Sequence, residues 1–255
     1  MRIVITGASM GIGAELAVHY ARKGAKVVVA ARSPEALEGV VKRCEGNAFA
    51  VPCDVTQPEQ CRALIERSVE KLGGLDALVN NAGMTQRVRF DEVDDLSLFE
   101  QLMRVNYLGA VYCTHFALPH LKTSRGLLVA ISSVTGLLGI PTRTGYAASK
   151  HAMQGFFDSL RIELTGTGVD VLVVSPGPVA TGIRERAAGA NTAANPEGER
   201  KAMSVEECVR LTAAAIDGRK REVIMPAGVR LALWANRVMP SLVDRRIAAR
   251  VKDLA

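Results

Sequence analysis

Two residues near the middle of the chain, Tyr146 and Lys150, have the types and the spacing for proton transfer. They are four positions apart, so they share one face of a helix. A free tyrosine has a pKa of about 10 and is a poor base at neutral pH, but a neighbouring ammonium group stabilises the phenolate and lowers that pKa. Ser133, thirteen positions before the tyrosine, offers a hydroxyl that can hold a substrate oxygen while Tyr146 transfers the proton. Tyrosine and lysine are also ordinary helix-surface residues, so the pair gains its meaning from the rest of the chain.

A glycine-rich turn opens the chain directly after the apolar run Ile3-Val4-Ile5. Gly7 permits a tight turn, Gly11 lets the backbone approach a pyrophosphate, and Gly13 allows a helix to pack closely on a strand. The first N–H groups of that helix offer a partial positive charge to phosphates. Three glycines can also simply make a turn. If a dinucleotide binds here, the contacts expected from the turn are Gly7, Ser9, Met10, Gly11, Ile12 and Gly13.

The residues after the second apolar run, Val27-Val28-Val29, indicate which dinucleotide is bound. An NAD-selective site places an acidic residue here, about 20 residues past the glycine turn, to accept a hydrogen bond from the ribose 2′-hydroxyl. This chain has Arg32 and Ser33 instead. We expect Arg32 to pair with a 2′-phosphate and Ser33 to be a second donor, which favours NADP(H) over NAD(H). The alternative is that Arg32 lies on the adenine or in solvent.

Polar residues also follow the third and fourth apolar runs, at strand ends where ligands collect in open α/β sheets. Asp54 either accepts a hydrogen bond from the adenine amino group or caps the helix that starts near Pro58. In Asn80-Asn81-Ala82-Gly83, we expect Asn80 to be the asparagine exposed to the ligand and Asn81 to be structural. The cofactor contacts predicted from these two segments are Asp54, Val55, Asn80, Ala82 and Gly83.

The elements that must position these residues are apolar β-branched runs in alternation with longer amphipathic segments. Runs such as Val171-Leu172-Val173-Val174 are continuous, which is typical of a parallel sheet buried on both faces. With 255 residues, 48% of them hydrophobic, the chain is predicted to be one α/β domain with a Rossmann fold over residues 1–255. Its doubly wound parallel sheet is expected to have about seven strands. The predicted strands are 2–6, 26–30, 48–52, 75–79, 126–131, 169–174 and 222–225, and the predicted helices are 11–23, 34–44, 57–72, 96–121, 146–164 and 204–217.

Composition and charge argue against several classes of protein. The five cysteines are odd in number and include no C-x-x-C pair, so neither a disulfide framework nor a metal site is expected, and the cytoplasm is favoured. No apolar run reaches the roughly 18–20 residues of a membrane span, and we expect no signal peptide before the first strand. The net charge of +6 comes from residues 219–255, with nine basic and three acidic residues. The neutral main body argues against nucleic-acid binding.

Residues 176–203 lie outside the core pattern and are rich in Gly, Ala, Asn and Pro. A loop of that length is usually a lid or a disordered segment, and we expect residues 177–203 to form a substrate lid. After Ser133, an apolar wall favours an apolar or amphipathic substrate, unless that wall is a subunit contact. The wall consists of Leu137, Leu138, Ile140 and Pro141.

Residues 226–255 are expected to form a basic C-terminal extension of two helices. Leu231 and Val238 lie on one side of the first helix, and Arg230 and Arg237 share another. The helix pair either packs beside the active site or a partner subunit, or it lies on anionic lipid with Trp234 near the arginine face. Peripheral membrane contact through this tail is therefore one of the expected partner interactions.

The glycine turn, Asn80-Asn81-Ala82-Gly83, Ser133, Tyr146-x-x-x-Lys150 and Ser175-Pro176-Gly177 together resemble the motifs of the classical short-chain dehydrogenase/reductase family. The match runs from residue 2 to about residue 181, in the family's order and spacing. Some relatives that prefer NADP carry a basic residue just before the second glycine, where this chain has Met10, so Arg32 is the main phosphate candidate. The run Ala31-Arg32-Ser33 resembles NADP-dependent hydroxysteroid-dehydrogenase-like members.

This resemblance implies a role for each matching residue. Tyr146 is then the general acid/base, Ser133 orients and polarises the carbonyl, and Lys150 binds the nicotinamide ribose and tunes the tyrosine. Asn106 matches the asparagine that holds a water in the proton relay. Val179 and Thr181 match residues used on the nicotinamide carboxamide, and the predicted cofactor site also includes Pro176 and Gly177. We expect a homodimer or a homotetramer.

The predicted function is an NADP(H)-dependent oxidoreductase that transfers a hydride between nicotinamide and a carbonyl or secondary alcohol. Within this class, the alternative is a 3-oxoacyl-thioester reductase of lipid synthesis. Outside it, the alternative is a regulatory protein that binds a dinucleotide without turnover. The complete set of Asn106, Ser133, Tyr146 and Lys150 favours the enzyme, because a binding-only protein has no need of a proton relay.

Overall fold

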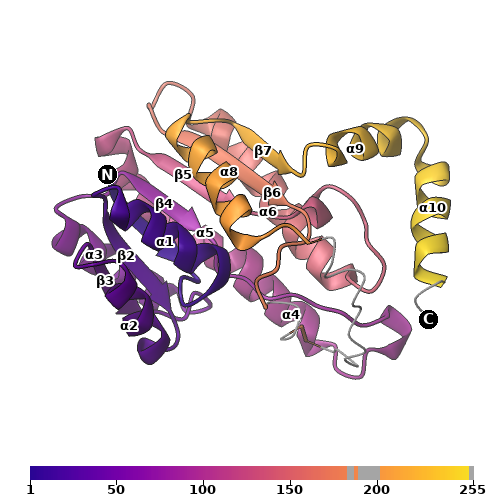
Figure 1. Ribbon diagram of the computed structural model, residues 1–255, viewed down its shortest axis with the longest axis horizontal. Coiled ribbons are helices and arrows are strands. Elements are labelled where there is room, and N and C mark those ends of the chain that lie inside the picture. The colour runs from indigo at the N-terminus through magenta and orange to yellow at the C-terminus, as the bar shows by residue number, and fades with distance from the viewer. Residues whose placement is uncertain (183–186, 189–201, 253–255) are drawn as a thin grey trace.

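One parallel sheet of seven strands forms the centre of the molecule in the computed structural model, which describes residues 1–182, 187–188 and 202–252. The strand order is β3-β2-β1-β4-β5-β6-β7, so the winding direction reverses between β1 and β4 (Figure 1). Open α/β sheets bind ligands at the carboxyl edge beside this reversal. The strands are β1 (Arg2–Thr6), β2 (Lys26–Ala31), β3 (Ala48–Pro52), β4 (Ala77–Asn80), β5 (Leu127–Ile131), β6 (Asp170–Pro176) and β7 (Glu222–Met225).

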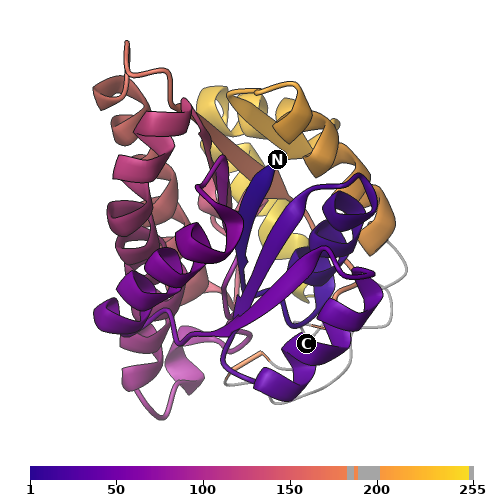
Figure 2. The ribbon, with the colours of Figure 1, turned by 90° about the vertical axis from the view of Figure 1, so that its left-hand side faces the viewer.

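Helices cover both faces of the sheet, which makes three layers (Figure 2). On one face pack α1 (Gly11–Arg22), α2 (Pro34–Arg43) and α8 (Val205–Asp217); on the other pack α3 (Pro58–Leu72), α5 (Gly109–Ser124) and α6 (Thr144–Glu163). Val27 and Val29 of β2 belong to the first core, and Val28 belongs to the second. Successive strand side chains point to opposite faces, which explains why these strands are apolar at every position. The predicted single-domain, doubly wound α/β fold is confirmed.

The predicted elements match the observed ones, with one local difference. The helix expected over 96–121 is three consecutive pieces: α4 (Ser97–Met103), a π-helical turn (Arg104–Leu108) and α5. At the start of α2, the Ser33 hydroxyl caps the helix and Pro34 is its first residue. The π-helical turn contains Asn106, one of the predicted site residues.

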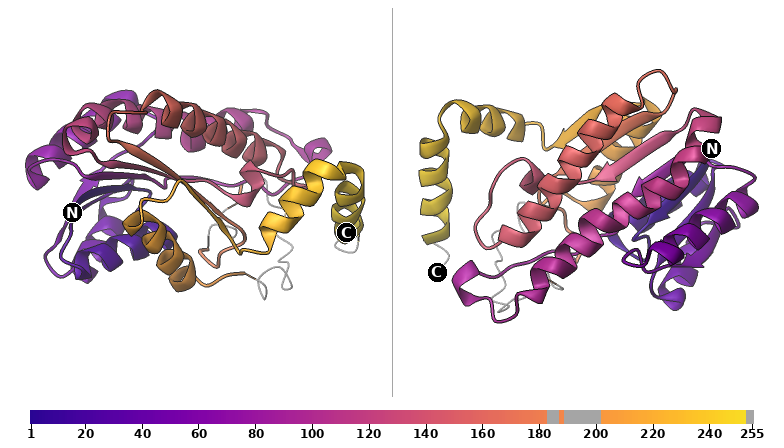
Figure 3. Two further views of the ribbon diagram at one scale, coloured as in Figure 1. Left: turned by 90° about the horizontal axis from the view of Figure 1, so that it is seen from above. Right: turned by 180° about the vertical axis from the view of Figure 1, so that it is seen from behind.

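The C-terminal extension forms two helices, α9 (Val229–Val238) and α10 (Pro240–Lys252), as predicted. They extend from the carboxyl end of β7 and stand off the main body (Figures 1 and 3). No residue of α9 is buried. Across the described ranges, no helix has the length and the hydropathy to cross a membrane.

Candidate active site

The glycine turn joins β1 to α1 at the carboxyl edge of the sheet. Gly7 and Gly11 have φ values of +63° and +57°, the left-handed region that favours glycine. A Cβ atom on Gly7 would lie 2.6 Å from the Ala82 Cα, and one on Gly11 would lie 3.2 Å from the Thr181 Cβ. A Cβ atom on Gly13 would collide with the Asn81 side chain. The three glycines therefore let the loops after β4 and β6 approach the start of α1.

Hydrogen bonds between β1 and the end of β4 fix this turn. Thr6 Oγ1 accepts from the backbone N–H groups of Asn81 (3.0 Å) and Ala82 (3.1 Å) and donates to the Val79 carbonyl. The Asn81 side chain donates to the carbonyls of Thr6 (2.9 Å) and Gly7 (3.0 Å). Asn81 thus has the structural position that the sequence indicated.

Asn80 differs from its prediction as the exposed asparagine. Its side chain is 2% exposed and donates to Thr114 Oγ1 at 3.0 Å. Its Oδ1 atom has no hydrogen-bond partner among the described residues. The last position of β4 points into the layer between the sheet and α5, which the sequence pattern alone did not distinguish from the ligand side. Asn80 therefore lies behind the cofactor edge rather than on its surface.

Arg32 and Ser33, the two residues predicted to select the dinucleotide, differ in whether their side chains already have partners within the protein. The Arg32 side chain is exposed, directly after β2, and makes no hydrogen bond or ion pair with any described residue. The Ser33 hydroxyl accepts from Ala36 N (3.3 Å) and donates to Glu35 Oε2 (3.0 Å). Arg32 is thus available to an anion, whereas Ser33 is engaged in capping α2.

Asp54 makes a tight turn at the end of β3. Its Oδ1 atom accepts from the backbone N–H of Thr56 (3.0 Å) and from the Thr56 hydroxyl (2.9 Å). Gln57 is the N-cap residue of α3, so the alternative that Asp54 caps this helix is wrong. Val55 is buried, and a Cβ atom on Gly109 would lie 2.8 Å from it. These residues hold the end of β3 against the start of α5.

The predicted proton-transfer residues come together beside the ends of β5 and α6. Tyr146 is in the first turn of α6, and Lys150 follows one turn later, with its Nζ 5.9 Å from the tyrosine ring centroid. Lys150 is 4% exposed and donates to the Ile131 carbonyl at 2.9 Å. Ser133, just after β5, lies near Tyr146, and its Oγ accepts from Thr135 N at 3.1 Å and donates to Thr135 Oγ1 at 3.2 Å. The Ser133 hydroxyl, the Tyr146 phenol and the Lys150 amine therefore lie beside one another.

Burial dominates the electrostatics of this group. It raises the pKa of Tyr146 above its ordinary value, while the Ser133 hydroxyl and the charge of Arg143 lower it in part. Burial also lowers the pKa of Lys150 to about 8. Burial thus acts against the charged form of both groups, and the lowering of the tyrosine pKa by Lys150 stays a prediction.

Asn106 lies behind this group, within the π-helical turn, and is fully buried. Its Nδ2 donates to Ser149 Oγ (2.9 Å) and to the Met84 carbonyl (3.0 Å), and its Oδ1 accepts from Met84 N (2.8 Å). A Cβ atom on Gly83 would lie 3.2 Å from Asn106 Oδ1 and 3.8 Å from Lys150 Nζ. Gly83 therefore lets the asparagine and the lysine approach one another. Single π-helical turns are rare and are often found at functional sites.

The segment after β6 closes the site on its other side. Pro176 ends β6, and Gly177 N donates to the Met225 carbonyl at 2.6 Å. Val179 is 7% exposed and forms a bridge with Met203. The backbone N–H of Thr181 donates to the Val179 carbonyl at 2.9 Å, and its side chain lies beside Gly11. Of the predicted lid, residues 183–186 and 189–201 lie outside the described residues.

Two residues at the site were not predicted from the sequence, Gln86 and Arg143. Gln86 is fully buried, and its Oε1 accepts from the backbone N–H groups of Gly145 (2.7 Å) and Tyr146 (3.2 Å). The Arg143 guanidinium carbon lies 5.9 Å from the Tyr146 ring centroid, and its Nη1 donates to Thr85 Oγ1 at 2.7 Å. Gln86 and Gly145 are 59 positions apart, so no local spacing indicates the contact.

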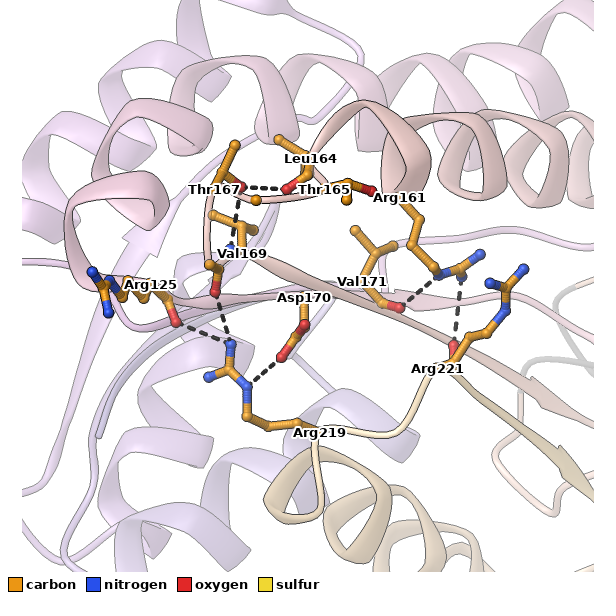
Figure 4. Close-up of a pocket in the computed structure, with 12 residues that line it drawn as sticks. Arg125, Arg161, Leu164, Thr165, Thr167, Val169, Asp170, Val171, Arg219 and Arg221 are labelled. Carbon is orange, nitrogen blue, oxygen red and sulfur yellow. Dashed lines mark hydrogen bonds and ion pairs between the residues drawn. The ribbon is translucent and has the colours of Figure 1, made fainter.

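A cavity of about 650 Å³ lies away from this group, at the amino end of β6 (Figure 4). Two of the arginines that line it make hydrogen bonds to the protein itself. Arg219 donates to the carbonyls of Gly126 (2.9 Å) and Gly168 (3.2 Å), and Arg161 donates to the Val171 carbonyl (3.1 Å). These contacts hold the loops at the amino edge together, and the cavity contains none of the predicted catalytic residues.

The fold and the site define a dinucleotide-binding α/β protein with a tyrosine–lysine pair beside its cofactor edge. The glycine turn has no space for side chains, so its backbone can approach a pyrophosphate. The Arg32 side chain has no partner among the described residues and can pair with an anion. These residues therefore fit a nicotinamide dinucleotide. Residues 1–191 match the family model described as short chain dehydrogenase, and the chain belongs to this family. The resemblance drawn from the motifs is thereby confirmed.

Individual relatives agree with this assignment. The chain is 34% identical over 248 residues to 11-beta-hydroxysteroid dehydrogenase-like 4A of Arabidopsis thaliana, covering 94% of this chain and 81% of that protein. It is 35% identical over 235 residues to human dehydrogenase/reductase SDR family member 7, covering 88% and 69%.

Two solved structures have the same fold. A short chain dehydrogenase/reductase from Burkholderia phymatum, in complex with NAD, superposes with a TM-score of 0.84 at 25% identity over 94% of each chain. An alcohol dehydrogenase from Thermococcus sibiricus, complexed with 5-hydroxy-NADP, gives 0.77 at 26% identity, covering 88% of this chain and 94% of that one. One of these relatives binds NAD and the other an NADP derivative, so a nicotinamide dinucleotide is supported and the choice between the two forms is a separate question.

Proposed function

We propose that this protein is an NADP(H)-dependent oxidoreductase acting on the carbonyl or secondary alcohol of an apolar or amphipathic substrate, with Tyr146 as the general acid/base. The observation that carries the proposal is the arrangement around Tyr146. The Ser133 hydroxyl lies near the phenol, and Lys150 Nζ and the Arg143 guanidinium carbon each lie 5.9 Å from its ring centroid. A phenol with a hydroxyl and two cations beside it can give up a proton and take it back.

When bound along the glycine turn, a nicotinamide dinucleotide would supply or accept the hydride at the substrate carbon. Ser133 and Tyr146 hold the substrate oxygen by hydrogen bonds. In the reductive direction the Tyr146 hydroxyl gives its proton to that oxygen, so the carbonyl becomes an alcohol; in the oxidative direction Tyr146 takes the proton from the alcohol. Lys150 holds positive charge beside the phenolate as it forms, which stabilises the charged state.

The preference for NADP(H) rests on Arg32. Its guanidinium is exposed at the end of β2 and is not paired with any described residue. A 2′-phosphate would gain a charge-assisted hydrogen bond there, whereas a 2′-hydroxyl would gain none comparable. The engaged state of Ser33 leaves Arg32 as the main determinant in this proposal.

The apolar character of the substrate rests on the segment after Ser133. Leu138 is buried, Leu137 and Ile140 are half-buried, and no charged residue occurs between Ser133 and Pro141. We also propose a homo-oligomer in the cytoplasm. Membership of the family supports the first, and five free cysteines support the second.

The proposal is tested by a substrate screen that follows NADPH absorbance. The panel contains ketones, steroids, 3-oxoacyl thioesters and sugars, each offered with NADPH and with NADH. We expect turnover with NADPH on apolar ketones or steroids and none on sugars. Tight NADPH binding with no turnover on any class would contradict the proposal and favour a protein that binds the dinucleotide without catalysis.

A further inference from the structure

The α9–α10 arm carries an apolar stripe that no part of the described chain covers. Leu231, Trp234 and Val238 are 71%, 60% and 57% exposed, and their spacing places them on one face of α9. Leu233 and Val229, on the other side of the helix, are half-buried. A surface helix normally turns its apolar face toward the protein core. In α9 this apolar stripe faces solvent instead.

Basic residues flank this stripe. Arg230 and Arg237 are exposed on α9, and Arg245 and Arg246 are exposed on α10. The only acidic residue described on either helix is Asp244. None of the four guanidinium groups makes a hydrogen bond or an ion pair with a described residue. An apolar face with tryptophan, bordered by unpaired arginines, is the composition of helices that lie in a membrane interface.

The corner between the two helices forms a hollow of about 400 Å³, lined by four apolar residues, one serine and one arginine. Its lining residues are Val238, Met239, Pro240, Ser241, Leu242 and Arg245. The apolar residues suit contact with acyl chains, and Arg245 can pair with a lipid phosphate.

We propose that the α9–α10 arm binds the surface of a membrane that contains anionic lipid. Charge complementarity favours this occupant over a second copy of the chain, because residues 226–255 contain six basic and two acidic residues and two such arms would repel each other. The arm follows the carboxyl end of β7, which is the sheet edge that carries the Tyr146 group, so a docked molecule turns its active-site edge toward the lipid (Figures 1 and 3).

The test is co-sedimentation with vesicles of phosphatidylcholine alone or mixed with phosphatidylglycerol. Trp234 is the only tryptophan of the chain, so its emission reports directly on the arm. We expect binding to the mixed vesicles only, a blue shift of the emission, and release by salt. Replacing Arg230, Arg237, Arg245 and Arg246 by Gln should weaken binding roughly a hundredfold or more, since each basic residue near an anionic surface contributes about a factor of five.

The matched control replaces four exposed basic residues elsewhere by Gln: Lys26, Lys42, Arg67 and Lys122. It removes the same charge and should bind like wild type. The combined change Leu231→Ser and Val238→Ser should abolish the blue shift. If the arm variant and the control variant lost vesicle binding equally, binding would depend only on the net charge of the protein, and the proposal would be overturned. It would also be overturned by a Leu231→Ser, Val238→Ser protein that binds vesicles normally but changes from dimer to monomer in analytical ultracentrifugation, because the arm would then be a subunit contact.

A second and independent observation concerns Gln86, and the inference from it rests on the proposed function. Its side-chain oxygen accepts from the N–H groups of Gly145 and Tyr146, at the start of the helix that carries the tyrosine. Its Nε2 donates to Thr144 Oγ1 at 3.4 Å. Its backbone pairs with Ala188, since Ala188 N donates to the Thr85 carbonyl and Arg87 N donates to the Ala188 carbonyl. Gln86 is thus fixed on both sides.

We infer that Gln86 is a positioning residue for Tyr146. Two N–H groups at the start of α6 have no partner within the helix, and Gln86 satisfies them from a fully buried position. Because one of the two belongs to Tyr146 itself, the amide fixes the backbone from which the phenol projects. A shift of about 1 Å in a reacting group can cost roughly a hundredfold in rate.

Three variants separate positioning from folding. Gln86→Met removes the acceptor at similar volume, Gln86→Glu retains an acceptor, and Gln101→Met makes the same change on the exposed face of α4. We expect Gln86→Met to lower kcat about tenfold to a hundredfold with little change in the Kd for NADPH, Gln86→Glu to recover part of that loss, and Gln101→Met to be neutral. This inference alone would be overturned if Gln86→Met were folded and fully active while wild type was active and Tyr146→Phe was inactive. The proposed function would then still stand.

Discussion

Arg32 is the residue on which cofactor choice depends in this account. It is exposed and unpaired among the described residues, while Ser33 beside it caps α2. A charge-assisted hydrogen bond is worth about 1.5–3 kcal/mol, so Arg32→Ala should weaken NADPH roughly tenfold to a hundredfold and leave NADH nearly unchanged. Isothermal titration of both cofactors measures this.

The neighbouring residue supplies the control for that titration. Ser33→Ala removes a helix cap, so it should lower the free energy of unfolding by about 0.5–2 kcal/mol with little effect on either cofactor. If Arg32→Ala weakened NADPH and NADH equally, Arg32 would be an adenine-stacking residue and the preference for NADP(H) would lose its basis.

Lys150 gives a prediction on pH. Its pKa in the folded protein is about 8, below the ordinary lysine value of about 10.4. Below pH 8 lysine is charged in both states, and the folded protein bears the full cost of burying that charge. As pH rises through this window the folded protein loses the proton before the unfolded chain does, so stability increases. Relative to Lys150→Met, wild type should gain stability between about pH 8 and about pH 10 in urea unfolding without cofactor. Parallel pH curves for the two proteins would contradict the burial of a charged amine.

At the scale of elements, the contact between β1 and the end of β4 holds the cofactor edge in shape. Thr6→Val keeps the volume but leaves the Asn81 and Ala82 N–H groups without their acceptor. Unfolding in urea should show a loss of about 1–3 kcal/mol, with weaker dinucleotide binding because the turn loosens. The control is Thr123→Val, an exposed threonine that bonds only to Pro119 within its own helix; it should change stability little. A Thr6→Val protein as stable as this control would show that the contact does not hold the turn.

The elements were predictable where one physical rule acts along a continuous segment. Buried parallel strands are apolar throughout, which is why the run around Val28 was placed correctly. The π-helical turn at Asn106 was not predictable, because it depends on how α4 and α5 pack rather than on a local signal. The positions of Asn80 and Gln86 were missed for a similar reason. Neighbouring asparagines look alike in sequence, and the partners of Gln86 lie 59 and 60 positions away.

At the scale of the whole molecule, the site and the arm lie on one edge for topological reasons. All seven strands are parallel, so β1, β4, β5, β6 and β7 all end at the edge where Tyr146 and the start of α9 are found. The sequence predicted both helices of the arm and its charge. It did not predict that the apolar stripe of α9 faces away from the body, because burial depends on what the rest of the fold offers as a partner. In this proposal, the Tyr146 group at the centre of the carboxyl edge of the sheet carries the chemistry. The α9–α10 arm at the end of the same edge contacts the anionic surface.

The most direct test of the central claim compares wild type and Tyr146→Phe on a substrate found in the screen, with NADPH binding measured on both. Loss of the phenolic hydroxyl removes the proton donor and leaves the glycine turn, Arg32 and Lys150 in place. General acid–base catalysis contributes roughly 10²–10⁴-fold, so kcat should fall by at least that factor while the Kd for NADPH stays close to wild type. Unchanged turnover in Tyr146→Phe would contradict the assignment of Tyr146 as the acid/base.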